Sequence, residues 1–128
     1  MRLGRLDHVN IRTANLLAMA DWYCRVLGMQ QGKRPPFAFP GAWLYCDGHP
    51  FVHLVGVGKQ PAGGDPTLEH FAFSASGLAE FTARLKAAGI AYRAAKVPGT
   101  AIIQINVFDP DRNHIHVDFN GEDEKAEN

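Results

Sequence analysis

The sequence has no excess of charge of either sign and no long apolar run, and both absences exclude classes of partner. Lysine plus arginine and aspartate plus glutamate both number 13, so the formal net charge is zero, and no basic stripe favours a nucleic acid. No apolar run approaches the roughly 20 residues of a bilayer-spanning helix, and residues 1–5 contain no apolar signal region. We therefore expect a cytoplasmic protein without nucleic-acid or membrane partners.

The sequence has only two cysteines and no phosphate-binding loop, which disfavours several classes of enzyme chemistry. Cys24 and Cys46 fall in a predicted helix and a predicted strand and form no motif, which favours buried, reduced thiols. No glycine-rich fingerprint follows a strand and opens a helix, and no Ser-His-Asp or Cys-His order has a specific spacing. At 128 residues the chain can bury one sizeable core without disulfides.

The sequence has six histidines, and four of them recur at matching positions of an internal repeat. His8 and His70 lie 62 residues apart, and each follows an acidic residue near the start of a strand-like segment. His53 and His116 lie 63 residues apart, and each belongs to a strand-like segment that follows a turn containing aspartate. A duplicated unit with a histidine near each end can bring four imidazoles to one point, which indicates a metal site.

The predicted secondary structure has the same order in both halves. In the first half a helix is expected between Asn15, a capping residue, and Gly28, with strands over 6–12, 29–33, 42–46 and 51–57. In the second half a helix is expected between Ser76, again as the cap, and Gly89, with strands over 68–74, 90–97, 101–108 and 114–119.

Each half is therefore β-α-β-β-β, and the fold class is α+β. We expect the two modules, at about 6–58 and 67–120, to form a curved mixed sheet around a metal cleft, with the helices outside. Residues 1–121 would then make a single domain, and the acidic residues 122–128 a flexible tail.

This order of elements and three motifs resemble the vicinal oxygen chelate superfamily, which includes glyoxalase I, extradiol dioxygenases and bleomycin-resistance proteins. The motifs are the Asp7-His8 strand opening, Trp22-Tyr23 followed by Leu27-Gly28, and Asp109-Pro110-Asp111-x-Asn113 before the last strand. The resemblance covers about residues 5–120 and implies a small-molecule substrate and a divalent ion, which could be Fe, Zn, Ni or Mn. In the family the first and last strand of each module supply the ligands, which implies His8, His53, His70 and His116 here.

The last-strand ligand positions depart from the glutamate that is usual in the family. Histidines at positions 53 and 116 leave the charge of the ion unneutralised and remove a carboxylate that could move a proton, so glyoxalase I proper is disfavoured. Iron(II) dioxygenases present two histidines and one carboxylate. Asp118 lies two residues after His116 and shares its sheet face, so it could ligate the ion or orient a ligand histidine.

We therefore expect a metal-dependent enzyme that chelates its substrate through adjacent oxygens, with dioxygenase-like chemistry favoured over lyase or isomerase chemistry. The alternatives are a metal-free binding protein of the bleomycin-resistance type and a vestigial fold kept as a dimeric scaffold. Strand edges that need covering and the apolar segment 37–43 predict a homodimer. His49 and His114 are assigned to turns and are not expected to be ligands.

Overall fold

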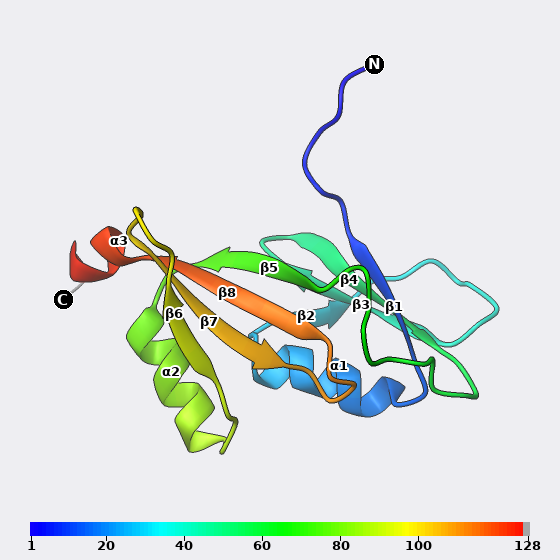
Figure 1. Cartoon of the computed structure of the whole chain (residues 1–128). Coiled ribbons are helices and arrows are strands. Elements are labelled where there is room, and N and C mark those ends of the chain that lie inside the picture. The colour runs from blue at the N-terminus through cyan, green and yellow to red at the C-terminus, as the bar shows by residue number, and fades with distance from the viewer. Residues whose placement is uncertain (127–128) are drawn as a thin grey trace. The chain divides into compact units, whose positions relative to one another are not determined.

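The chain divides into two compact units with the same order of elements (Figure 1). The structure is a computed structural model that describes residues 1–126. The first unit, Met1–Gly63, contains β1 (Val9–Thr13), α1 (Leu16–Arg25), β2 (Gln30–Gly32), β3 (Gly41–Cys46) and β4 (His49–Gly56). The second unit contains β5 (His70–Ala75), α2 (Leu78–Ala87), β6 (Arg93–Lys96), β7 (Ile102–Phe108), β8 (His114–Asn120) and α3 (Gly121–Ala126). The predicted α+β fold of two βαβββ modules is confirmed.

In each unit the first and last strands lie side by side in a four-stranded sheet. The strand orders are β1-β4-β3-β2 and β5-β8-β7-β6. The β1–β4 and β5–β8 pairs are parallel, and the remaining pairs are antiparallel. Parallel neighbours need a long connection, which the helix and the two intervening strands supply. The histidines near the two ends of each module are thereby brought side by side, His53, His70 and His116 within their strands and His8 directly before β1.

One face of each sheet is apolar and is covered by the helix of the same unit (Figure 1). In the first unit, Leu44 and Val52 are fully buried against α1, which contributes the buried side chain of Tyr23. In the second unit, Phe81 of α2 contacts Phe119 of β8, with 5.9 Å between the ring centroids. Because side chains alternate along a strand, the residues between these apolar positions point to the opposite face. Among the described residues, no helix is both long and apolar enough to cross a membrane.

Both helices begin with a hydrogen-bonding pattern that differs from the predicted caps. Asn15 is the N-cap residue of α1, but its side chain makes no cap hydrogen bond. Instead, the backbone N–H of Asn15 donates to Oγ1 of the buried Thr13 at 2.9 Å. The N-cap residue of α2 is Gly77, which has a left-handed φ of 87°, and the predicted cap Ser76 precedes it.

Helix α3 forms where the sequence predicted a flexible tail from residue 122, although residues 127–128 lie outside the described part of the chain. The Glu124 carboxylate accepts the backbone N–H groups of Gly77 and Leu78, each at 2.9 Å. These donors lie at the start of α2, where a helix lacks partners within itself. A negative charge at this end also interacts favourably with the helix dipole.

Replacing Glu124 by alanine should therefore lower the free energy of unfolding by about 1 kcal/mol, the usual value of a helix cap. Urea denaturation of the full chain measures this loss. Asp123→Ala is the matched control, because Asp123 is an exposed acid on the same helix. An equal loss in both variants would show that Glu124 does not act as the cap of α2.

Candidate metal centre

His8 and His53 stack face to face in the first unit. The register of β1 and β4 pairs Asn10 with His53, and His8 precedes Asn10 by two residues, so both imidazoles lie on one face. Their ring centroids are 3.9 Å apart and their planes differ by 8°. Trp43, the partner of His53 across β3 and β4, stacks on His53 at 4.0 Å. The His53 ring therefore lies between an imidazole and an indole.

His70 and His116 repeat this arrangement in the second unit. Here the register of β5 and β8 pairs Ala72 with His116, and His70 precedes Ala72 by two residues. The two rings are 4.1 Å apart with 13° between their planes. The structure thus brings the predicted ligands together as one pair in each unit. Convergence of both pairs on a single ion stays a prediction.

A third imidazole, that of His114, lies beside the second pair. His114 is the first residue of β8, where the predicted strand over 114–119 also begins, and it pairs directly with His70, although it was set aside as a ligand together with the preceding turn. The ligand nitrogens of His70, His114 and His116 all lie within 4.8 Å of one another. The spacing of two residues between His114 and His116, which puts both on one strand face, was the signal that could have found it. The equivalent residue in the first unit, 63 positions earlier, is Phe51.

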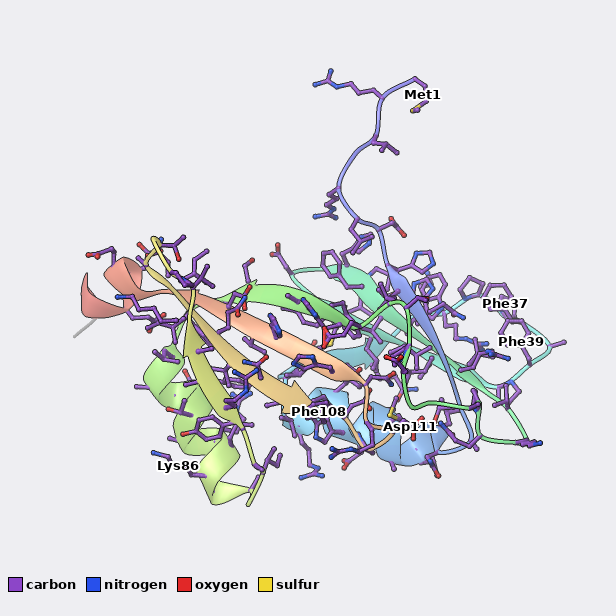
Figure 2. The ribbon with its side chains drawn as sticks, in the orientation of Figure 1. Met1, Phe37, Phe39, Lys86, Phe108 and Asp111 are labelled. Atoms are coloured by element: carbon purple, nitrogen blue, oxygen red, sulfur yellow. The ribbon has the colours of Figure 1, made fainter. Side chains whose placement is uncertain are left out.

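The start of β8 is fixed by the turn built around Asp109, a buried residue. Its Oδ1 accepts the backbone N–H groups of Asp111 and Asn113, each at 2.9 Å, and its Oδ2 accepts from Asn113 Nδ2 at 2.8 Å. Phe108, which ends β7, stacks on His114 with 5.0 Å between ring centroids. Figure 2 labels Phe108, which precedes this turn, and Asp111, which lies within it. The turn and the stacked ring together place the His114 imidazole.

An acidic side chain holds the first-strand histidine in each unit. Asp7 Oδ2 lies 2.7 Å from Nδ1 of His8, and Glu69 Oε2 is hydrogen-bonded to Nδ1 of His70. The hydrogen bond from His8 lowers the pKa of Asp7, and the bonds from His70 and then His114 lower the pKa of Glu69. An ionised carboxylate only accepts. The Nδ1 atoms of His8 and His70 therefore donate, which leaves their Nε2 lone pairs available to a metal.

Burial keeps the last-strand histidines neutral, as a metal ligand must be. His53 and His116 are each 9% exposed. Burial, followed by the nearby charge of His8 or His70, lowers the pKa of each imidazole below its ordinary value. His53 also has a backbone hydrogen bond with Pro50, which acts in the opposite direction.

Two further observations favour a divalent ion as the partner of these imidazole nitrogens. Nε2 of His53 is buried and has no hydrogen-bond partner within residues 1–126, so its lone pair is unused. With metal–nitrogen bonds of about 2.1 Å, two nitrogens on one ion lie roughly 3 to 4 Å apart. The ligand nitrogens of His70 and His116, which lie within 4.8 Å of each other, approach this spacing. Imidazole nitrogens with an available lone pair suit Zn, Fe or Ni and, less selectively, Mn.

Asp118 adds a carboxylate on the face of β8 that carries His116. Its Oδ1 lies 3.9 Å from Nδ1 of His116, which is too long for a hydrogen bond. This oxygen is buried and has no hydrogen-bond partner in the described part of the chain. A buried acceptor without a donor is costly, so a cation beside it would be stabilised. The sequence suggested two roles for Asp118, as a ligand or as the residue that orients His116. The hydrogen bond that the second role requires is not formed.

Comparison with known proteins identifies the family. The family model described as the Glyoxalase/Bleomycin resistance protein/Dioxygenase superfamily matches residues 5–117. The chain belongs to this superfamily. The resemblance drawn from the Asp-His, Leu-Gly and Asp-Pro-Asp motifs is therefore confirmed. None of the curated proteins compared with the chain matches it.

Solved structures of the superfamily share the fold at low sequence identity. A glyoxylase/bleomycin resistance protein/dioxygenase domain from Frankia sp. EAN1pec is 20% identical, with a TM-score of 0.73 over 93% of this chain and 99% of that one. Lactoylglutathione lyase from Agrobacterium tumefaciens is 17% identical, with a TM-score of 0.71 over 95% and 98%. A fosfomycin resistance protein from Listeria monocytogenes is 14% identical, with a TM-score of 0.74 over 98% of each chain. At these identities the likeness shows the superfamily fold alone.

The lowered pKa values of His53 and His116 predict how stability depends on pH. In the unfolded chain these imidazoles titrate near their ordinary value of about 6.5, whereas in the folded chain they stay neutral to lower pH. Below about 6.5 the unfolded state therefore binds more protons, and the stability of the folded state falls. Urea denaturation of the metal-free chain between pH 8 and pH 5.5 should show this loss.

Replacing both histidines by glutamine provides the control for this titration. Asp7 and Glu69 have lowered pKa values and titrate below the window, so they do not contribute to the loss. The double variant should lose stability less steeply between pH 8 and pH 5.5. An unchanged pH dependence would mean that neither imidazole is kept neutral by folding.

Proposed function

We propose that this superfamily member is a divalent-metal-dependent enzyme whose substrate binds through two adjacent oxygens. One observation carries the proposal: in each unit an acid-anchored first-strand imidazole stacks on a buried last-strand imidazole. The proposed ligands are His8, His53, His70 and His116, which would hold one Fe, Zn, Ni or Mn ion. The ion, when bound, supplies Lewis-acid polarisation of the substrate oxygens. The four histidines would hold the ion. Because His53 and His116 occupy the last-strand positions, no carboxylate binds the ion from there.

Within this proposal we favour oxygen-dependent, dioxygenase-like chemistry over lyase or isomerase chemistry. A proton-transfer mechanism needs a general base within reach of the substrate, and the last-strand positions hold His53 and His116 in place of carboxylates. Asp118 supplies a half-buried carboxylate beside His116, with its Oδ1 atom buried. Two histidines and one carboxylate are the ligand set of non-haem iron(II) oxygenases.

A second candidate function, metal-free binding of an aromatic ligand, is favoured by the rings on the loop between β2 and β3 (Figure 2). Phe37 and Phe39 stack with 5.0 Å between ring centroids, and each is 45% exposed. Phe37 also lies 6.5 Å from Trp43, which stacks on His53. A flat ligand could extend this series of rings through further stacking.

The homodimer and the cytoplasmic location stay predictions. In the first unit β1 and β2 are the outer strands of the sheet, and in the second unit β5 and β6 are. Outer strands present unpaired backbone groups that a second chain can cover. The exposed rings of Phe37 and Phe39 offer apolar surface for such a contact.

Metal content separates the two candidate functions. His70→Ala should remove most of the bound ion, because it removes a proposed ligand from the second pair. His49→Ala should retain most of it, because His49 is not a proposed ligand and contacts only Asp7 beside the first pair, with Nε2 2.8 Å from its backbone carbonyl oxygen and 3.4 Å from its Oδ1. Elemental analysis of the purified full chain after loading with Zn²⁺ measures both. Equal metal content in these variants would contradict the ligand assignment, and a wild-type chain that binds an aromatic probe but no ion would favour the second candidate.

Oxygen uptake tests the favoured reaction type. A chain loaded with Fe²⁺ without air should consume oxygen when a catechol is added as the probe with adjacent oxygens, and the Zn²⁺-loaded chain should not, because Zn²⁺ has no redox chemistry. An oxygen electrode records both. Isomerisation of a hemithioacetal by the Zn²⁺-loaded or Ni²⁺-loaded chain, without oxygen uptake by the Fe²⁺ form, would contradict dioxygenase-like chemistry.

A further inference from the structure

A continuous series of hydrogen bonds in the second unit connects the backbone of β6 to His70. Asn106 Nδ2 donates to the backbone carbonyl of Arg93 at 3.2 Å, and Asn106 Oδ1 lies 2.8 Å from Nε2 of His114. Nδ1 of His114 lies 2.7 Å from Glu69 Oε1. The other carboxylate oxygen of Glu69 is hydrogen-bonded to Nδ1 of His70. Every member of the series belongs to the same unit.

The backbone carbonyl at one end determines the direction of each hydrogen bond. A carbonyl oxygen only accepts, so the amide nitrogen of Asn106 faces Arg93 and its oxygen faces His114. Nε2 of His114 faces this oxygen and donates to it when this nitrogen carries a proton. At the other end, the Glu69 carboxylate accepts through both oxygens, so Nδ1 of His114 and Nδ1 of His70 also donate.

These directions give the two imidazoles different roles. Both nitrogens of His114 are already engaged, Nδ1 by Glu69 and Nε2 by Asn106, so an ion could bind either one only by displacing that partner, even though His114 lies within the nitrogen cluster. His70 donates only from Nδ1, and its Nε2 keeps the lone pair. A histidine ligand is commonly oriented in this way by a carboxylate on its other nitrogen.

We propose that Glu69 is a positioning residue that aims Nε2 of His70 at the ion, and that His114 and Asn106 hold Glu69 in place without binding the ion themselves. The proposal deepens the proposed function and rests on it for the presence of the ion. The orientation of His70 is a property of the metal-free chain and can be measured without it.

The first unit shows why this series is specific to the second. The positions equivalent to Asn106 and His114, 63 residues earlier, are Trp43 and Phe51, whose side chains offer no hydrogen-bond acceptor. Asp7, the equivalent of Glu69, accepts from His8 in the same way, and His49, rather than Phe51, lies beside it, with Nε2 3.4 Å from Asp7 Oδ1. The substitution His114→Phe therefore places in the second unit the residue that the first unit has at the equivalent position.

The tautomer of His70 in the metal-free full chain tests the positioning role directly. Long-range ¹H–¹⁵N correlation spectra at pH 8 should show the proton on Nδ1 of His70 in the wild type. Glu69→Ala should shift the population towards the Nε2–H form that isolated imidazoles favour, and His114→Phe should shift it in the same direction by a smaller amount. Glu80→Ala, an exposed acid on α2, is the matched control and should change nothing. An unchanged His70 tautomer in folded Glu69→Ala would overturn the proposal.

Cobalt binding distinguishes positioning from ligation. With Co²⁺ as the probe, Glu69→Ala should lower affinity about 10-fold to 100-fold, the usual effect of losing such a partner. His114→Phe and Asn106→Ala should also weaken binding, and all three variants should keep the wild-type visible spectrum. A changed spectrum in His114→Phe would overturn the proposal, since it would make His114 a ligand. If the wild type binds no Co²⁺, the proposed metal site fails, and the tautomer measurement alone decides the role of Glu69.

Discussion

The parallel pairing of the first and last strands in each unit is the constraint on which the candidate site depends. Its register sets Asn10 beside His53 and Ala72 beside His116. In both units the first-strand histidine lies two residues before the paired position, so it meets the last-strand imidazole on the same face. A register slip of one residue would turn one ring to the helix-covered face. The stacking distances of 3.9 and 4.1 Å thus follow from backbone hydrogen bonding rather than from a loop.

The two units repeat this frame but surround it with different chemistry. Trp43 covers His53 in the first unit, where the second unit has Asn106 beside His114. Aromatic rings extend the first pair towards Phe37, whereas hydrogen bonds extend the second pair to the backbone of β6. The surroundings of the first pair are therefore mainly aromatic, and those of the second pair are mainly hydrogen-bonded.

Much of the fold and part of the site could be predicted from the sequence, because both depend on local patterns that occur twice. Alternating polarity, helical spacing and glycines predicted the order of elements, and the 62-residue and 63-residue offsets predicted the histidine pairs. The support of His70 could not be predicted, because Glu69 and His114 are 45 residues apart and meet only through strand register. The same holds for Glu124, which caps a helix that begins 46 residues earlier. The predicted strand over 114–119 contained His114, but its contacts with Glu69 and Asn106 depend on strand register and could not be predicted.

Both histidine pairs are proposed to share a single ion, and the ratio of bound ion to chain tests this most directly. The metal-free full chain would be titrated with Zn²⁺, separated from free ion by gel filtration and analysed for zinc and protein. X-ray absorption of the same sample would count the imidazoles around the metal. A shared site predicts one zinc per chain with four imidazole ligands. Two zinc ions per chain, each with fewer imidazoles, or no bound zinc would contradict it.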